Sequence, residues 1–207
     1  MGALAAEADP PTTVRDPAAA VDVHVADSLS GLRAEPLLSA RRLADIGAGA
    51  GFPGLVLAVA LPGTQVDLVE AGRRKTEVIE RLAAAAGAQN ARAVRARAEE
   101  WGAAAGAEAY DAVTARALAA LPVLVEYAAP LLRQGGSLVA WKGARDEAEE
   151  RAGRAAAAQL GLDVADPVRV EPFPGARERH LHVFRKVGPT PEGFPRRAGM
   201  ARKRPLG

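Results

Sequence analysis

Short apolar runs alternate with segments of helical spacing from about residue 42 to residue 161. The apolar runs are typical of buried strands, and the longer segments repeat apolar residues every three to four positions, as amphipathic helices do. Five strands are expected, at residues 42–46, 65–70, 91–96, 110–116 and 137–142. A helix is expected after each strand, near residues 53–60, 73–86, 99–105, 118–132 and 144–160.

Two further strands are expected at the end of this pattern, at residues 163–173 and 179–186, joined only by a short Pro/Gly turn. A parallel pair would need a crossover of about a dozen residues or more, so these two strands must pair antiparallel. Alternating strands and helices form a mainly parallel sheet with helices on both faces. The sequence therefore predicts an α/β fold with a mainly parallel seven-stranded sheet and an antiparallel last strand.

The two ends of the chain have a different character. Residues 1–17 are rich in Ala, Pro and Asp without periodicity, and we expect them to be poorly ordered. Residues 18–40 form an N-terminal helical part, with one helix expected over 18–31. Residues 187–207 contain four prolines and four glycines, which predicts an extended tail. The domain itself is expected to span residues 18–186.

The segment DIGAGAGFPG, residues 45–54, lies between the first strand and the first helix. Its closely spaced glycines let the backbone pass under a ligand where a Cβ atom would clash. In an open α/β sheet the first strand–helix turn is the expected ligand site. A tight turn without any ligand is the alternative.

Glu70 ends the second strand, 19 residues beyond Gly51, where a carboxylate can accept hydrogen bonds from both hydroxyls of a ribose. The alternative is an exposed acid paired with Arg73 or Arg74. Loop and acid together indicate a nucleoside-containing cofactor. NAD favours G-x-G-x-x-G, whereas this loop reads G-A-G-A-G-F-P-G from Gly47, with no glycine or alanine at position 52. S-adenosylmethionine (SAM) needs room for a methionine chain and an acid nearby, such as Asp45, and the antiparallel last strand is a feature of SAM-dependent folds.

Composition narrows the chemistry further. The 207 residues include no cysteine, which excludes disulfides and thiolate metal ligands, and the three histidines offer no convincing metal site. No apolar run approaches the roughly 20 residues of a membrane span, and no signal peptide is recognised. Net charge is +2 but uneven: residues 1–40 carry −4 and residues 185–207 carry +6. A basic tail indicates either a solvated end or a contact with a polyanion.

An ordered set of motifs runs through the chain: VRDP (14–17), HVADSL (24–29), DIGAGAGFPG (45–54), LVEAGRRK (68–75), TARALA (114–119), KG (142–143), ERHL (178–181) and TPEGFPRRAGMARKRPL (190–206). This set resembles the RsmG (GidB) family, which methylates N7 of a guanine in bacterial small-subunit (16S) ribosomal RNA with SAM. The front departs from the family pattern, with Pro10-Pro11-Thr12 in place of Asn-Leu-Thr and without the usual further N-terminal helices.

The resemblance implies a Rossmann-like class I SAM-dependent methyltransferase and assigns residues to its site. The expected cofactor-binding residues, with those from the loop and strand argument above, are Asp45, Gly47, Gly49, Gly51, Phe52, Glu70, Ala98, Glu99 and Arg116. The expected RNA-binding residues are His24, Lys142, Arg179, His180, Arg196, Arg197, Arg202, Lys203 and Arg204.

Guanine N7 has an exposed lone pair and no proton, so its methylation needs no general base. We therefore expect positioning groups, with Arg116, Lys142 and Arg179 as the catalytic candidates. N7 lies in the deep groove of A-form RNA, so the target should be a loop, bulge or splayed base, in the small subunit or its assembly intermediate. A monomeric, cytoplasmic enzyme is expected, without metal or membrane contact. The alternatives are an NAD-dependent oxidoreductase and an inactive RNA-binding or assembly protein.

Overall fold

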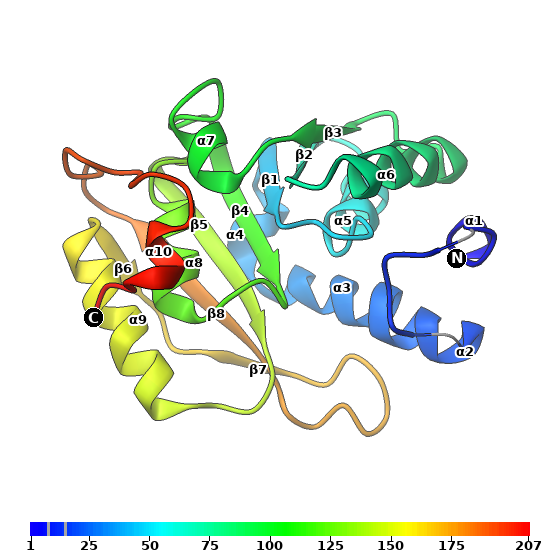
Figure 1. Ribbon diagram of the computed structural model, residues 1–207. Coiled ribbons are helices and arrows are strands. Elements are labelled where there is room, and N and C mark those ends of the chain that lie inside the picture. Colours follow the sequence, from blue (N-terminus) through cyan, green and yellow to red (C-terminus); the bar gives the residue numbers. More distant parts are fainter. Residues whose placement is uncertain (8, 15) are drawn as a thin grey trace.

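The computed structural model describes residues 1–7, 9–14 and 16–207 (Figure 1). Ala8 and Arg15, from the predicted N-terminal segment and the VRDP motif, lie outside the described residues. The described strands form one eight-stranded sheet in the order β3-β2-β1-β4-β5-β8-β6, with β7 also paired to β8. Their bounds are β1 Arg42–Ile46, β2 Gln65–Glu70, β3 Ala91–Arg95, β4 Tyr110–Arg116, β5 Leu132–Lys142, β6 Leu162–Val164, β7 Val168–Val170 and β8 Arg179–Lys186.

The first five strands are parallel, and β8 pairs antiparallel with β5, β6 and β7. The predicted antiparallel pairing at the chain's end is confirmed. The predicted number of seven strands was wrong, because the described residues form eight. The single strand expected over residues 163–173 is two short strands separated by Ala165-Asp166-Pro167. Proline has no N–H to donate to a strand ladder, which accounts for the break.

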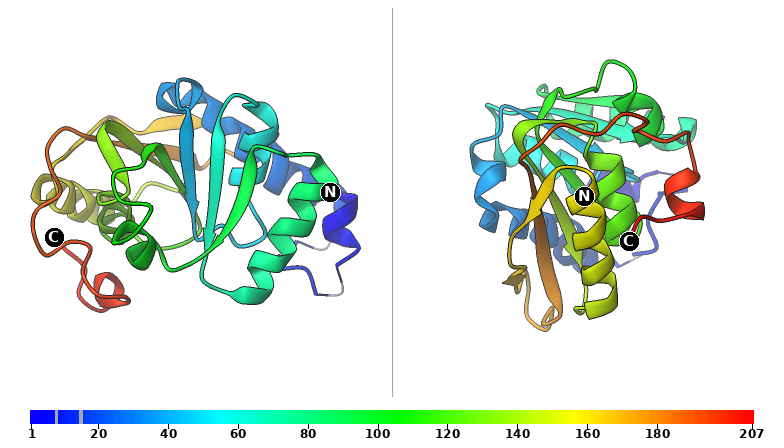
Figure 2. Two further views of the ribbon diagram at one scale, coloured as in Figure 1. Left: turned by 90° about the horizontal axis from the view of Figure 1, so that it is seen from above. Right: turned by 90° about the vertical axis from the view of Figure 1, so that its left-hand side faces the viewer.

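Helices cover both faces of the sheet (Figure 2). Alternate strand residues point to opposite sides, as at β5, where Leu138 and Ala140 join one apolar cluster and Val139 and Trp141 join the other. The helices are α1 Gly2–Ala5, α2 Pro17–Ala20, α3 Asp27–Leu29, α4 Glu35–Leu38, α5 Gly54–Ala60, α6 Arg73–Ala86, α7 Ala98–Gly102, α8 Leu121–Ala128, α9 Glu147–Gln159 and α10 Met200–Lys203. A π-helical stretch, η1 Val21–Ala26, and a 3-10 turn, η2 Ser30–Arg33, adjoin α3, so the single α-helix expected over 18–31 is a composite.

Both ends of the chain carry more structure than expected. In the N-terminal segment Leu4 of α1 is buried among the apolar residues near α6. In the C-terminal segment Ala201 is buried in the other cluster, with Phe194 and Leu206 packed against it, so this segment is not simply extended. Apolar side chains in both segments find partners that local composition does not reveal. The termini lie on opposite sides of the molecule (Figure 1).

Strands β1 and β4 are neighbours in the sheet. From this pair β2 and β3 follow on one side and β5 follows on the other, so the strand order reverses here. Such a switch point leaves a crevice at the carboxyl ends of the strands. The loops after β1, β2, β3 and β4 meet there, and so does the N-terminal helical part. Among the described residues no helix is long and apolar enough to cross a membrane.

Candidate active site

The glycine loop follows β1 and is tied to the neighbouring strand, because the backbone N–H groups of Gly47 and Ala48 donate to the carbonyl of Val69 at 2.8 and 3.2 Å. Gly47 and Gly49 have φ angles of +66° and +60°, a region that favours glycine. A Cβ atom on Gly47 would lie 2.5 Å from a Leu118 methyl group, whereas one on Gly49 would meet nothing closer than 3.9 Å. Gly49 thus leaves open the space above the loop.

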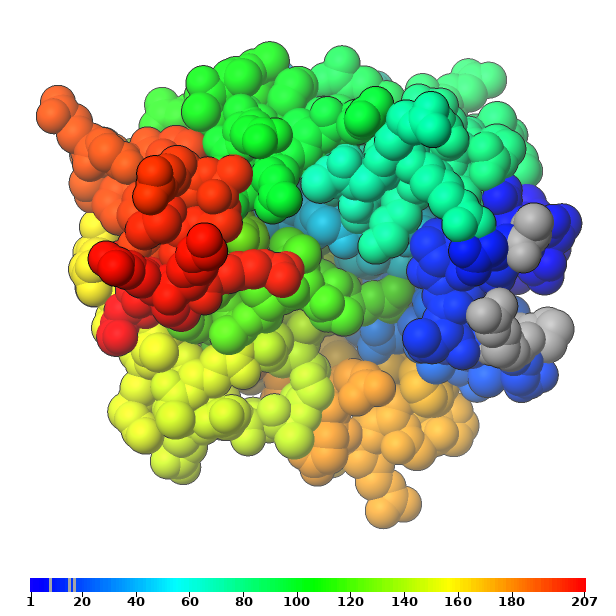
Figure 3. All heavy atoms as spheres, in the orientation of Figure 1, coloured from blue at the N-terminus to red at the C-terminus, as the bar shows by residue number. Residues whose placement is uncertain are grey.

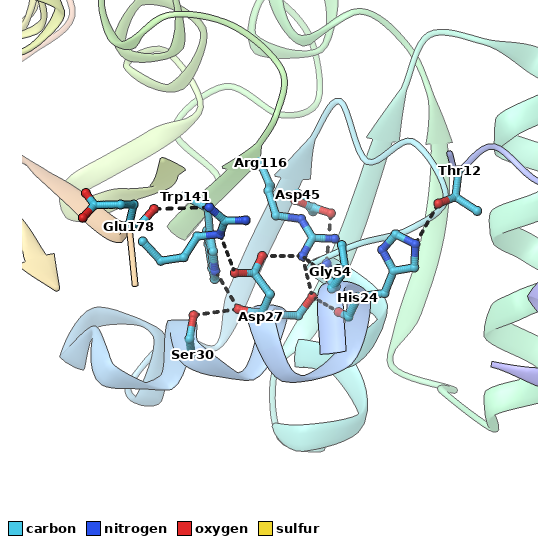
Figure 4. Close-up of polar contacts among 12 residues, drawn as sticks. Thr12, His24, Asp27, Ser30, Asp45, Gly54, Arg116, Trp141 and Glu178 are labelled. Atoms are coloured by element: carbon cyan, nitrogen blue, oxygen red, sulfur yellow. Dashed lines mark hydrogen bonds and ion pairs between the residues drawn. The ribbon is translucent and has the colours of Figure 1, made fainter. Parts of the chain in front are cut away.

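Asp45 supports this loop from behind. Its carboxylate is 1% exposed and accepts hydrogen bonds from the Gly54 N–H at 2.9 Å and the Thr114 hydroxyl at 2.8 Å (Figure 4). Burial raises the pKa of Asp45 to about 6. Both Asp45 and Gly51 were expected to bind the cofactor. Neither is among the described residues that line the cavity over the glycine loop. Both instead fix the shape of the turn.

Glu70 holds the loop from the second strand. Its Oε2 accepts from the Gly49 N–H at 3.1 Å and its Oε1 accepts from the Gly72 N–H at 2.8 Å. A carboxylate has about four acceptor positions, so Glu70 keeps capacity for further donors. It lines the cavity, where a ribose would present two hydroxyl groups.

A cavity of about 650 Å³ opens over the loop, and we call it the donor cavity. Its walls come from the loops after four parallel strands. Seven of the expected cofactor-binding residues line it together, namely Gly47, Gly49, Phe52, Glu70, Ala98, Glu99 and Arg116. Its volume and its mixture of acceptors and apolar surface fit a nucleoside-containing ligand. Its remaining lining residues are Pro11, His24, Ala48, Ala50, Val69, Ala71, Lys75, Ala96, Arg97, Ala117, Leu118, Tyr127 and Arg202.

A second cavity of about 730 Å³, the acceptor cavity, adjoins the first, and Pro11, His24, Lys75, Arg116 and Ala117 line both. Lys142 and Arg179 line only the acceptor cavity, and so do Asp27 and Trp141. The structure therefore brings the three expected positioning residues, Arg116, Lys142 and Arg179, to one cavity.

Arg116 stands at the junction of the two cavities and is held by the N-terminal helical part. Its Nη1 donates to Asp27 Oδ2 at 2.8 Å and to the Val23 carbonyl at 3.0 Å (Figure 4). The Arg116 and Asp27 side chains are only 15% and 9% exposed, so this ion pair is largely desolvated. The guanidinium is thereby fixed in one orientation, and its Nε and Nη2 make no hydrogen bond with the described residues.

Asp27 was not predicted as a site residue. Its Oδ1 is buried and makes no hydrogen bond with the described part of the chain, and Arg179 Nε lies 3.7 Å from it. Trp141 Nε1 donates to the Asp27 carbonyl at 2.9 Å and fixes the backbone there. The motif HVADSL contains Asp27, but no local pattern indicates that its partner is an arginine 89 residues away.

His24 is 8% exposed, and its ring stacks on Phe52 of the glycine loop with centroids 4.7 Å apart and planes inclined by 8°. Its Nε2 is 2.8 Å from the Thr12 hydroxyl. Burial, followed by the nearby Arg116 charge, lowers the pKa of His24. His24 therefore joins the glycine loop to the N-terminal segment. This packing role differs from the RNA contact expected of it.

The remaining basic residues divide into anchored and exposed groups. Lys142 Nζ lies 2.6 Å from Glu149 Oε1, and His180 is 8% exposed with Nδ1 3.0 Å from the Gly143 carbonyl. Buried His180 is poorly placed for the RNA contact expected of it. Arg196 forms a two-point ion pair with the buried carboxylate of Glu126. Four expected RNA-binding residues of the tail are exposed, namely Arg197, Arg202, Lys203 and Arg204.

Comparison with protein families identifies this architecture. Residues 11–181 match the model of GidB, described as rRNA small subunit methyltransferase G. The chain belongs to the GidB family. The GidB relatives include the ribosomal RNA small subunit methyltransferase G of Rubrobacter xylanophilus, 42% identical over 93% of this chain and 75% of the relative. The enzyme of the same name from Pelotomaculum thermopropionicum is 41% identical over 88% of this chain and 77% of the relative.

Solved structures agree with this GidB assignment at the level of fold. A predicted O-methyltransferase from Agrobacterium tumefaciens superposes with a TM-score of 0.60 at 24% identity, covering 79% of this chain and 81% of that protein. The S-adenosylmethionine-dependent methyltransferase SibL gives a TM-score of 0.61 at 16% identity, covering 78% of this chain and 55% of that protein. The fold of this GidB chain is that of the class I SAM-dependent methyltransferases.

Proposed function

We propose that this chain transfers a methyl group from SAM to N7 of a guanine in bacterial 16S ribosomal RNA, with residues 18–186 as its catalytic domain. Membership of the GidB family supports the reaction and the RNA. The observation that carries the proposal is the pair of adjoining cavities, one over the glycine loop and one lined by Arg116, Lys142 and Arg179.

The donor cavity has the residues that SAM needs. Glu70 would accept from the ribose hydroxyls, and the open space above Gly49 admits the ligand close to the backbone. Ala98 and Glu99 form the wall that follows β3, where the family resemblance places the adenine. SAM supplies an electrophilic methyl group on a sulfonium.

The acceptor side has to orient a base rather than remove a proton. Arg116, fixed by Asp27, would hold the guanine O6 or a neighbouring phosphate at the junction of the cavities. Lys142 and Arg179 would grip the RNA backbone around the splayed base. Orientation supplies much of the rate in such a displacement, and a rigid arginine at the junction is suited to it.

The deciding experiment is methyl transfer from radiolabelled SAM to small ribosomal subunits that lack the modification, with the methylated base mapped. We expect one N7-methylguanine in 16S rRNA. Product at an exocyclic amine would refute the reaction, and SAM binding without transfer would favour the inactive assembly protein. Stabilisation by NADH rather than SAM in a thermal-shift assay would favour the oxidoreductase, which family membership disfavours. A monomeric state and a cytoplasmic location remain predictions, testable by light scattering and fractionation.

A further inference from the structure

The C-terminal segment, residues 194–206, lies along the side of the donor cavity formed by α7 and α8 (Figure 3). Sequence reasoning assigned its basic residues to RNA alone. Two of its contacts, however, reach residues that line the donor cavity, Glu99 and Leu118.

The first contact joins the segment to the wall that follows β3. The backbone N–H of Gly199 donates to Glu99 Oε1 at 2.9 Å, and the Glu99 side chain is buried. A buried carboxylate needs a donor, and Gly199 supplies one. Glu99 is therefore oriented by the segment as well as by its own helix.

The second contact joins the segment to the loop after β4, which packs on the glycine loop. Arg202 Nη2 donates to the Leu118 carbonyl at 2.9 Å, and Arg202 itself lines the donor cavity. The Leu118 side chain packs so closely on Gly47 that a Cβ atom there would lie 2.5 Å from it. Arg202 thus holds the residue that packs against the loop.

The segment is fastened independently of both contacts. Glu126 is 1% exposed and is paired at both carboxylate oxygens with Arg196, whose Nη2 also donates to the Arg204 carbonyl at 2.9 Å. Ala201 is also buried, in the apolar cluster. An ion pair of this kind fixes the register of the segment, because its buried carboxylate is costly to leave unpaired.

We infer that residues 194–206 form one wall of the methyl-donor site, and that Arg202 is a positioning residue for the donor rather than an RNA contact. This inference rests on the proposed function, because the ligand of the cavity is taken to be SAM. The guanidinium would hold Leu118 and, through it, the glycine loop in the geometry that receives the donor.

The test measures the binding of SAM and S-adenosylhomocysteine to the full chain by calorimetry, and the KM values for SAM and for small subunits. Arg202→Met should weaken SAM binding and raise the KM for SAM by about tenfold, the equivalent of one hydrogen bond to a charged group, with the KM for subunits little changed. Arg202→Lys should recover part of the loss. Lys203→Met, one position away in α10, should leave SAM affinity unaltered, and Arg154→Met on the exposed side of α9 is the control for charge alone.

Two results would overturn the inference while the proposed function stands. One is SAM affinity in Arg202→Met equal to that of the unsubstituted protein. The other is a raised KM for subunits alone in Arg202→Met, which would make Arg202 an RNA contact. Failure of the unsubstituted protein to bind SAM would overturn the proposed function, and the inference with it.

Discussion

Removal of the Asp27 carboxylate is the sharpest test of how the acceptor site is built. The Asp27 and Arg116 side chains are 9% and 15% exposed and lie 2.8 Å apart. Removing one member of a buried ion pair costs about 3–5 kcal/mol, because the other charge stays buried. Arg116 keeps the Val23 carbonyl as an acceptor, so we expect the lower end, about 3 kcal/mol, for Asp27→Ala.

For a chain of 207 residues, 1 kcal/mol corresponds to about 2–4 °C in the melting temperature. Asp27→Ala should therefore lower the melting temperature by about 6–12 °C. Arg116→Met alone should also destabilise the protein, since it leaves the Asp27 carboxylate buried. In the double variant neither charge is left alone, so the loss should be smaller than the sum of the two by about 1.5 kcal/mol or more.

Urea unfolding of the unsubstituted protein, Asp27→Ala, Arg116→Met and the double variant completes the double-mutant cycle. Asp27→Asn, which keeps the shape and one acceptor oxygen but removes the charge, should lose less stability than Asp27→Ala and should lower methyl transfer, because Arg116 loses its ion pair. If the loss of stability in the double variant equals the sum of the two single losses within about 0.5 kcal/mol, the coupling between Asp27 and Arg116 is refuted. Asp27→Asn with unchanged transfer would show that the orientation of Arg116 does not matter to the reaction.

Three further predictions concern the loop, its support and the acceptor side. Gly49→Val should abolish SAM binding in a folded protein, since the side chain would enter the open space above a loop with positive φ; Gly63→Ala, in an open turn, is its control in calorimetry. Because the pKa of Asp45 is raised to about 6, the folded protein keeps a proton on Asp45 between about pH 4 and 6, where the unfolded chain has lost it. The free energy of unfolding should therefore fall by about 3 kcal/mol as the pH rises through this range to 7. Urea titrations at several pH values should show a smaller decline in Asp45→Asn, and equal slopes would contradict the raised pKa. Lys142→Ala should leave SAM affinity unchanged and slow methyl transfer about tenfold in single-turnover assays. An effect on SAM affinity alone would show that Lys142 does not contact the RNA.

Local patterns in the sequence determined the main architecture. The strand and helix rhythm predicted the parallel sheet, and the short turn before β8 required an antiparallel final pairing, because hydrogen-bonding geometry and connection length are local constraints. The glycine loop and Glu70 were also predictable, since an α/β sheet places the ends of its first two strands side by side. The structure brings them into direct contact through Gly49.

Tertiary structure alone decided what the charged residues do. Arg116 meets Asp27 across 89 residues and Arg196 meets Glu126 across 70, and no local pattern encodes which acid an arginine will meet. Sequence reasoning therefore assigned Arg196 and Arg202 to RNA, whereas Arg196 closes an internal ion pair and Arg202 touches the donor cavity. Periodicity specifies which face of an element is buried, but the pairing of distant charges depends on how the completed elements pack, and that is set only in the folded chain.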